Sequence, residues 1–121
     1  MTKDAADAVD AARLRAAVEA ERAGTVEQIA NLERNLAGII DAAELTSTDD
    51  EHDPEGATIA YERAQVSALL RQARSDLVDL DDALERIDSG TVRTCAACDG
   101  PIALARLLAL PGTRTCIHCA V

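Results

Sequence analysis

Four cysteines in two C-x-x-C pairs are the residues of this sequence best suited to chemistry. They are Cys95, Cys98, Cys116 and Cys119. Two thiolates at this spacing bind one side of a metal ion, and a second pair brought round by a loop completes a tetrahedral site. The pattern therefore predicts a structural Zn2+ site with all four cysteines as ligands. Disulfides or a redox dithiol would use the same residues and are the weaker alternative.

The ligand set also indicates what a metal would do here. We call the two C-x-x-C turns the first knuckle (residues 95–98) and the second knuckle (residues 116–119). A catalytic zinc keeps an open position for water and commonly uses His or carboxylate ligands, whereas four thiolates fill the site. His118 lies within the second knuckle, and we expect it to be exposed because the cysteines already complete the set. We therefore expect a protein without catalytic activity.

The composition favours packed helices as the elements that carry this site. The chain has 121 residues, with Tyr61 as its single aromatic residue and no Phe or Trp. Aromatic side chains bury the most area per residue, so a large globular core is not expected without them. Helices packed through Ala and Leu are the natural alternative. The length allows one ordinary domain, or one small module with an extended element.

Two stretches of heptad spacing predict two long helices that face one another. Their apolar positions recur in steps of four and three, which keeps one stripe turned toward a partner helix. Arg22 interrupts the first stripe and Arg63 occupies one position of the second. Residues 1–12, rich in Ala and Asp, fit either a helix or a frayed end. The stripes consist of Val18, Thr25, Ile29, Leu32, Leu36, Ile39 and Ala43, and then of Ile59, Val66, Leu70, Ala73, Leu77, Leu80, Leu84 and Ile87.

A polar segment between the stripes predicts a return of the chain, and thus an antiparallel coiled-coil hairpin. This segment, within residues 46–58, has no apolar periodicity. Asp53 followed by Pro54 is a favourable helix start, and Ser89-Gly90 a favourable stop, so the second helix should span about Pro54 to Asp88. A longer intermolecular coiled coil is the alternative, but the Pro-Gly-containing break favours the intramolecular return.

The predicted fold is thus mostly α: a two-helix hairpin with a small C-terminal module. Residues 1–90 hold the N-terminal segment and the hairpin with its acidic tip at 46–58, and residues 91–121 hold a four-cysteine zinc finger. Between the knuckles we expect a short helix from Pro101 to Pro111 that packs on the hairpin. Its apolar residues are Ile102, Leu104, Leu107, Leu108 and Leu110.

The charge of the chain argues against binding to nucleic acid. The net charge is −10, and residues 91–121, with three arginines and one aspartate, account for +2, which leaves −12 for residues 1–90. Such a body repels a phosphate backbone and fits a partner with a basic surface, although acids also keep a long helical surface soluble. The charged start of the chain is unlike a signal peptide, and no apolar run approaches the ~20 residues of a membrane span. We therefore expect a reduced, cytoplasmic protein without a membrane segment.

The residues of the finger resemble a known family. Cys95-x-x-Cys98, Ile102, Arg106, Pro111 and Cys116-x-x-Cys119 match the four-cysteine zinc finger of the DksA/TraR family of bacterial transcription factors. With the hairpin, the resemblance extends over about residues 18–121. It implies a non-catalytic factor that binds RNA polymerase and inserts its coiled-coil tip through the secondary channel toward the active centre. We expect this factor to be a monomer. There it would modulate initiation without reading DNA sequence.

The tip departs from the pattern that the resemblance implies, Asp-x-x-Asp-x-Ala. Aligned at Asp53, this chain has Gly56 at the second acidic position and Thr58 at the alanine. Five acids nevertheless crowd this segment, and we expect them to form the partner-binding surface. They are Asp49, Asp50, Glu51, Asp53 and Glu55. The alternative function is a zinc-stabilised coiled-coil adaptor that binds another protein.

Overall fold

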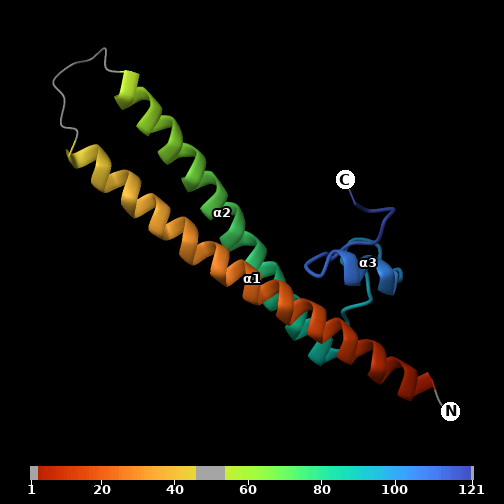
Figure 1. Cartoon of the computed structure of the whole chain (residues 1–121). Coiled ribbons are helices and arrows are strands. Elements are labelled where there is room, and N and C mark those ends of the chain that lie inside the picture. Colours follow the sequence, from red (N-terminus) through yellow and green to blue (C-terminus); the bar gives the residue numbers. More distant parts are fainter. Residues whose placement is uncertain (1–2, 46–53, 121) are drawn as a thin grey trace. The chain divides into compact units, whose positions relative to one another are not determined.

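Two long helices dominate the structure, a computed structural model that describes residues 3–45 and 54–120 (Figure 1). Helix α1 spans Lys3–Leu45, α2 spans Pro54–Ser89, and the short α3 spans Leu104–Ala109. Among the described residues no strand forms, and one isolated bridge pairs Thr94 with Pro101. The expectation of a mostly helical fold with a hairpin and a four-cysteine module is confirmed. No helix in the described part of the chain has the length and apolarity to span a membrane.

The residues at the two ends of α2 explain where this helix begins and ends. Pro54 occupies the first helical position, where its missing N–H costs no hydrogen bond. At the other end Gly90 adopts a left-handed conformation with φ of 79°. The N–H of Gly90 donates to Ile87 O at 3.2 Å and that of Thr91 to Arg86 O at 2.9 Å. This pair of bonds is a Schellman motif, which ends the helix and turns the chain toward the first knuckle.

Ion pairs between the two helices show their antiparallel order. Arg15 on α1 pairs with Asp88 on α2. Arg22, one heptad further along α1, pairs with Asp81 at 2.6 Å, one heptad back along α2. The charge that Arg22 brings into the apolar stripe is therefore paired with the carboxylate of Asp81. Helix α1 also begins at Lys3, well before the first predicted heptad position at Val18. The residues between them are rich in alanine, which favours a helix.

The chain forms two compact units, and both long helices contribute to each. The hairpin unit consists of Thr25–Ser75, and the finger unit of Met1–Gly24 with Asp76–Val121. In the hairpin unit, Leu32, Leu70 and Ala73 form a buried cluster. Ile29, Leu36 and Val66 pack against that cluster, so the core of this unit is made of predicted stripe positions. Burial of these side chains stabilises the pairing of the two helices.

The finger unit has a larger core that brings three elements together. Val18 and Leu80 of the stripes are buried there beside residues that heptad spacing had not indicated, Leu14, Ala83 and Val92. From the finger, Ile102 and Leu107 are fully buried in the same cluster, together with Cys95 and Cys116. The predicted packing of the finger on the long helices is therefore confirmed for its central apolar residues. Leu110 instead remains 52% exposed.

Helix α3 is shorter than the sequence predicts. We expected a helix from Pro101, but α3 begins at Leu104 and ends at Ala109, so Ile102 and Leu110 lie outside it. The N–H of Ile102 donates to Arg93 O at 2.8 Å, which holds this residue in a bridge to the segment before the first knuckle. This bond keeps Ile102 outside the helix, although Pro101 is a favourable residue for a helix start.

The acidic tip lies mainly outside the described residues. Asp49, Asp50, Glu51 and Asp53 fall in the segment 46–53, which the structure does not describe. Glu55 lies in the first turn of α2. The expectation of a partner-binding surface there stays a prediction.

Candidate metal centre

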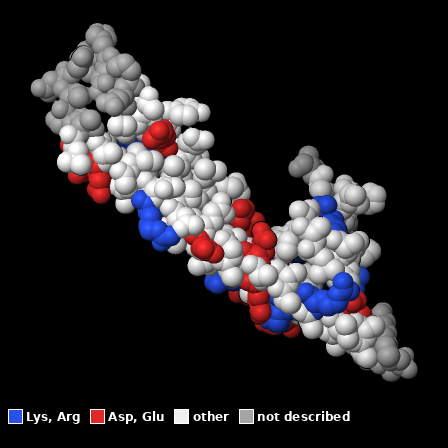
Figure 2. All heavy atoms as spheres, in the orientation of Figure 1, with Lys and Arg blue, Asp and Glu red and all other residues white. Residues whose placement is uncertain are grey.

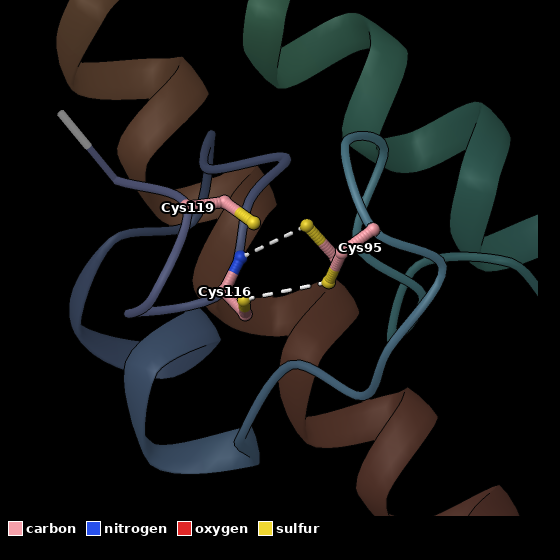
Figure 3. Close-up of side chains that lie close together, drawn as sticks. Cys95, Cys116 and Cys119 are labelled. Atoms are coloured by element: carbon pink, nitrogen blue, oxygen red, sulfur yellow. Dashed lines mark hydrogen bonds between the residues drawn. The ribbon is translucent and has the colours of Figure 1, made fainter.

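The four cysteines converge on one point of the finger unit. Their sulfur atoms all lie within 4.8 Å of one another. Cys98 Sγ and Cys116 Sγ are 3.8 Å apart. Four sulfurs at the Zn–S distance of about 2.3 Å in a tetrahedron stand about 3.8 Å from each other. Figure 3 shows Cys95 facing Cys116 and Cys119 from the opposite knuckle. The cluster is consistent with a structural zinc ion, as the cysteine spacing predicts.

Each knuckle is closed by its own backbone hydrogen bonds. In the first, Cys95 N–H donates to Gly100 O at 2.7 Å and Asp99 N–H to Cys95 O at 3.0 Å. Asp99 takes a left-handed conformation, with φ of 61°, which is uncommon outside glycine but tolerated by Asp. In the second, the N–H groups of Cys119 and Ala120 both donate to Cys116 O at 3.1 Å. These turns aim each pair of sulfurs in one direction.

Backbone N–H groups also point at the sulfurs. Ala97 N–H donates to Cys95 Sγ at 3.4 Å, and Gly100 N–H to Cys98 Sγ at 3.4 Å. A third bond joins the knuckles, because Cys116 N–H donates to Cys95 Sγ at 3.3 Å (Figure 3). Such bonds withdraw charge from thiolates, and this lets several anionic sulfurs share one cation.

Hydrogen bonds separate the cysteine pKa values. The N–H of Cys116 donates to the Cys95 sulfur and, against the opposing effect of burial, lowers the pKa of Cys95 to about 6. The Cys119 thiol donates to Cys116, and this bond raises the pKa of Cys119 to about 12. Without a metal the cluster thus retains protons, and a metal ion that binds there must displace them.

Burial closes one side of the cluster and leaves the other open. Cys95 and Cys116 are buried in the finger unit's core, while Cys98 is exposed and Cys119 is half-buried. His118 is exposed, as expected for a residue outside the ligand set. The arrangement fits a metal that joins two chain segments.

Ion pairs attach the finger to α2. The guanidinium of Arg114 lies 3.2 Å from Asp79 Oδ1 and 3.2 Å from Asp82 Oδ2. Arg86 donates to the same Asp82 carboxylate at 2.8 Å and reaches Thr113 O at 3.4 Å. We call these four side chains, Asp79, Asp82, Arg86 and Arg114, the α2 clamp. Figure 2 shows basic side chains among acidic ones over the finger unit.

The clamp was not found from the sequence, although a signal was present. Residues 79 and 82 lie three apart on one helix face, and Arg114 lies in the basic C-terminal segment. Nothing in the sequence shows which of the many acids on α2 meets which arginine. That choice follows from the close approach of the chain at Gly112, where an added Cβ would lie 3.4 Å from Asp79 Cβ.

Comparison with known proteins agrees with this geometry. Residues 90–121 match the family described as prokaryotic dksA/traR C4-type zinc finger. Residues 90–121 of this chain therefore form a dksA/traR C4-type zinc finger. The family match begins at residue 90, whereas the compact unit that contains the finger also includes parts of α1 and α2.

The long helices share this likeness. The chain is similar to a solved structure described as that of the transcription factor DksA2 from Pseudomonas aeruginosa, with 29% sequence identity and a TM-score of 0.51. The similarity covers 85% of this chain and 79% of that one. No curated protein sequence gave a significant match. Both matches are to a zinc finger or transcription factor rather than to an enzyme, in agreement with the expectation of a non-catalytic dksA/traR protein.

Proposed function

We propose that this protein is a non-catalytic transcription regulator that binds bacterial RNA polymerase. In this proposal the acidic coiled-coil tip enters the secondary channel toward the active centre and modulates initiation. The observation that carries the proposal is the dksA/traR finger together with the likeness of 85% of the chain to a transcription factor of that kind. The protein would act as a monomer in the cytoplasm, without sequence-specific DNA binding.

The division of labour within the chain follows from the same proposal. Residues 91–121 form the finger, in which Cys95, Cys98, Cys116 and Cys119 hold structural zinc. Residues 1–90 supply the hairpin, whose net charge of −12 follows from the −10 of the chain and the +2 of the finger. A negative hairpin suits a partner with an electropositive channel and disfavours direct contact with DNA.

Pull-down of purified bacterial core RNA polymerase with the zinc-loaded protein tests the proposal. We expect stable binding that weakens with salt, because the contact is partly electrostatic. If no polymerase is retained, the regulator proposal fails, and the alternative function of a zinc-stabilised adaptor for another protein takes its place.

The role of the tip is tested separately from binding. The double substitution Asp53→Ala and Glu55→Ala should change transcription output in vitro while polymerase affinity stays within about twofold, since the proposal assigns these acids to the effect on initiation rather than to binding. Asp41→Ala with Glu62→Ala is the matched control, because both acids are exposed on the long helices. Equal output from the tip variant and the wild type would remove the tip from the mechanism.

A further inference from the structure

The segment 113–115 places the second knuckle, and it is held through its carbonyl groups. Thr113 O accepts from Arg86 Nη2 at 3.4 Å, Arg114 O from Ala96 N–H at 2.9 Å, and Thr115 O from Arg106 Nε at 2.9 Å. Three successive carbonyls are thus bonded to α2, to the first knuckle and to α3. An irregular segment gains its fixed course from such bonds, because it has no helix or sheet ladder of its own.

Arg106 contacts this segment at two points. Its Nη2 lies 3.5 Å from Thr113 Oγ1, and that hydroxyl donates to Thr115 O at 3.3 Å. The guanidinium therefore binds the carbonyl of Thr115 directly and supports it a second time through a hydroxyl. Both contacts come from one half-buried side chain in the last turn of α3.

The Thr115 carbonyl and the Cys116 N–H belong to the same planar peptide unit. While the carbonyl accepts from Arg106, the N–H donates to Cys95 Sγ at 3.3 Å. A charged donor on the carbonyl fixes the orientation of this peptide and polarises its N–H, which strengthens the bond to the sulfur. Arg106 is thereby linked through one peptide to a cysteine of the opposite knuckle.

We propose that Arg106 is a positioning residue of the zinc site and acts on it through the Thr115–Cys116 peptide. Its role is to aim the N–H that draws charge from the Cys95 thiolate and to hold the second knuckle at the distance that the metal requires. This inference rests on zinc binding by the cluster and is independent of polymerase binding.

The substitution Arg106→Gln tests the proposal in the full-length protein. Zn2+ affinity, measured by competition with a chromophoric chelator, should fall about 10- to 100-fold, the usual range for groups that orient metal ligands. The Co2+-substituted protein should show a shifted sulfur-to-cobalt charge-transfer band, because the hydrogen bond to one ligand sulfur is altered. Arg106→Lys keeps the charge and one donor, and we expect it to recover part of the affinity and of the band position.

Arg93→Gln is the matched control. It removes the same charge from the finger, but its side chain pairs with Asp10 at 3.7 Å and not with the segment 113–115. Its Zn2+ affinity and Co2+ spectrum should equal those of the wild type. If Arg106→Gln binds zinc as tightly as Arg93→Gln, or binds more weakly with an unshifted cobalt band, the positioning role is overturned.

A second substitution keeps the test decisive if Arg106→Gln fails to fold. Thr113→Val removes only the hydroxyl between Arg106 and the Thr115 carbonyl, at nearly constant volume. Loss of this support should weaken Zn2+ binding about fivefold and move the cobalt band in the same direction. Unchanged affinity and spectrum in this variant would also overturn the proposal.

Discussion

Gly100 serves the first knuckle in two ways that depend on its lack of a side chain. Its N–H donates to Cys98 Sγ at 3.4 Å. A Cβ added to it would lie 3.2 Å from the same sulfur, closer than comfortable van der Waals contact. The sulfur is not free to move aside, because it belongs to the four-sulfur cluster. Position 100 therefore favours glycine, because a side chain there would crowd the sulfur of Cys98.

The substitution Gly100→Ala should lower Zn2+ affinity by roughly tenfold or more, since it displaces a ligand sulfur and lengthens the N–H···S bond. Chelator competition measures the change. Gly38→Ala is the control, because Gly38 lies in α1 with nothing within 4 Å of an added Cβ, and its zinc affinity should not change. Equal affinities for the two variants would show that the crowding at Cys98 has no consequence.

The separated pKa values predict how zinc binding depends on pH. With a pKa of about 6, Cys95 is already a thiolate at pH 7.5, while Cys119, with a pKa of about 12, is protonated. As long as the metal-free finger keeps these hydrogen bonds, Zn2+ should therefore release more protons as the pH falls through about 6, because the Cys95 thiol becomes protonated there. Affinity should fall as the pH falls, most steeply below about pH 6.

Calorimetry of Zn2+ binding in buffers of different ionisation enthalpy measures this proton release. While the finger is folded, the same two pKa shifts also predict how its free energy of unfolding depends on pH. The lowered pKa of Cys95 stabilises the fold at high pH, and this stabilisation is lost as the pH falls through about 6. The raised pKa of Cys119 stabilises the fold at low pH, and this stabilisation is lost as the pH rises toward about 12. A proton count independent of pH between 5 and 7.5 would contradict these assignments.

At the scale of elements, the α2 clamp joins the finger to a long helix through Asp82. This carboxylate accepts from Arg86 at 2.8 Å and faces Arg114 at 3.2 Å. Arg86 is the more buried partner, with its side chain 17% exposed, and its Nη1 has no hydrogen-bond partner among the described residues. Removal of the Asp82 charge would leave a guanidinium desolvated without its carboxylate.

The substitution Asp82→Asn should destabilise the zinc-loaded protein by about 1–2 kcal/mol, a value that allows for the partial exposure of the Arg114 side of the pair. Urea unfolding measures the difference. Asp81→Asn is the control, because the pair of Asp81 with Arg22 is more exposed and should be worth at most about 1 kcal/mol. A larger loss from Asp81→Asn than from Asp82→Asn would show that the clamp does not hold the finger.

The sequence predicted elements that depend on local pattern and missed those that depend on a third partner. Heptad spacing located Leu32, Leu70 and Ala73 in the core, since each helix meets one other helix there. It passed over Leu14 and Ala83, which are buried in the core that the finger completes. Periodicity describes one face of a helix, so a second packed element lies beyond its scope.

In the metal centre, too, the sequence predicted one part and missed another. Cysteine spacing predicted the cluster, because the chemistry of ligation is written in residue types. The contact of Arg106 with the Thr115 carbonyl could not be predicted from residue types, since the acceptor is a backbone group that every residue possesses. The position of α3 likewise depended on the bond from Ile102 N–H to Arg93 O, not on the proline before it.

At the scale of the whole molecule, two separate cores give the two units different dependence on the metal. The core of the finger unit includes Cys95 and Cys116 themselves, beside Ile102 and Leu107. Loss of zinc therefore removes a connection at the centre of that core. The cluster of Leu32, Leu70 and Ala73 in the hairpin unit contains no metal ligand. Long helices that share an apolar seam retain much of their stability without it.

Zinc removal should therefore unfold the finger while much of the helical signal remains. After chelation we expect hydrogen exchange, followed by mass spectrometry, to lose protection over residues 92–120, and to lose part of it around Leu14 and Ala83, which pack on the finger. Protection near Leu32 and Leu70 should persist. Readdition of Zn2+ should restore the pattern, whereas Mg2+ should not, because thiolates select soft or borderline metals. A metal-free protein with full protection across 92–120 would contradict a structural role for zinc, and uniform loss over both units would show that the two cores unfold as one.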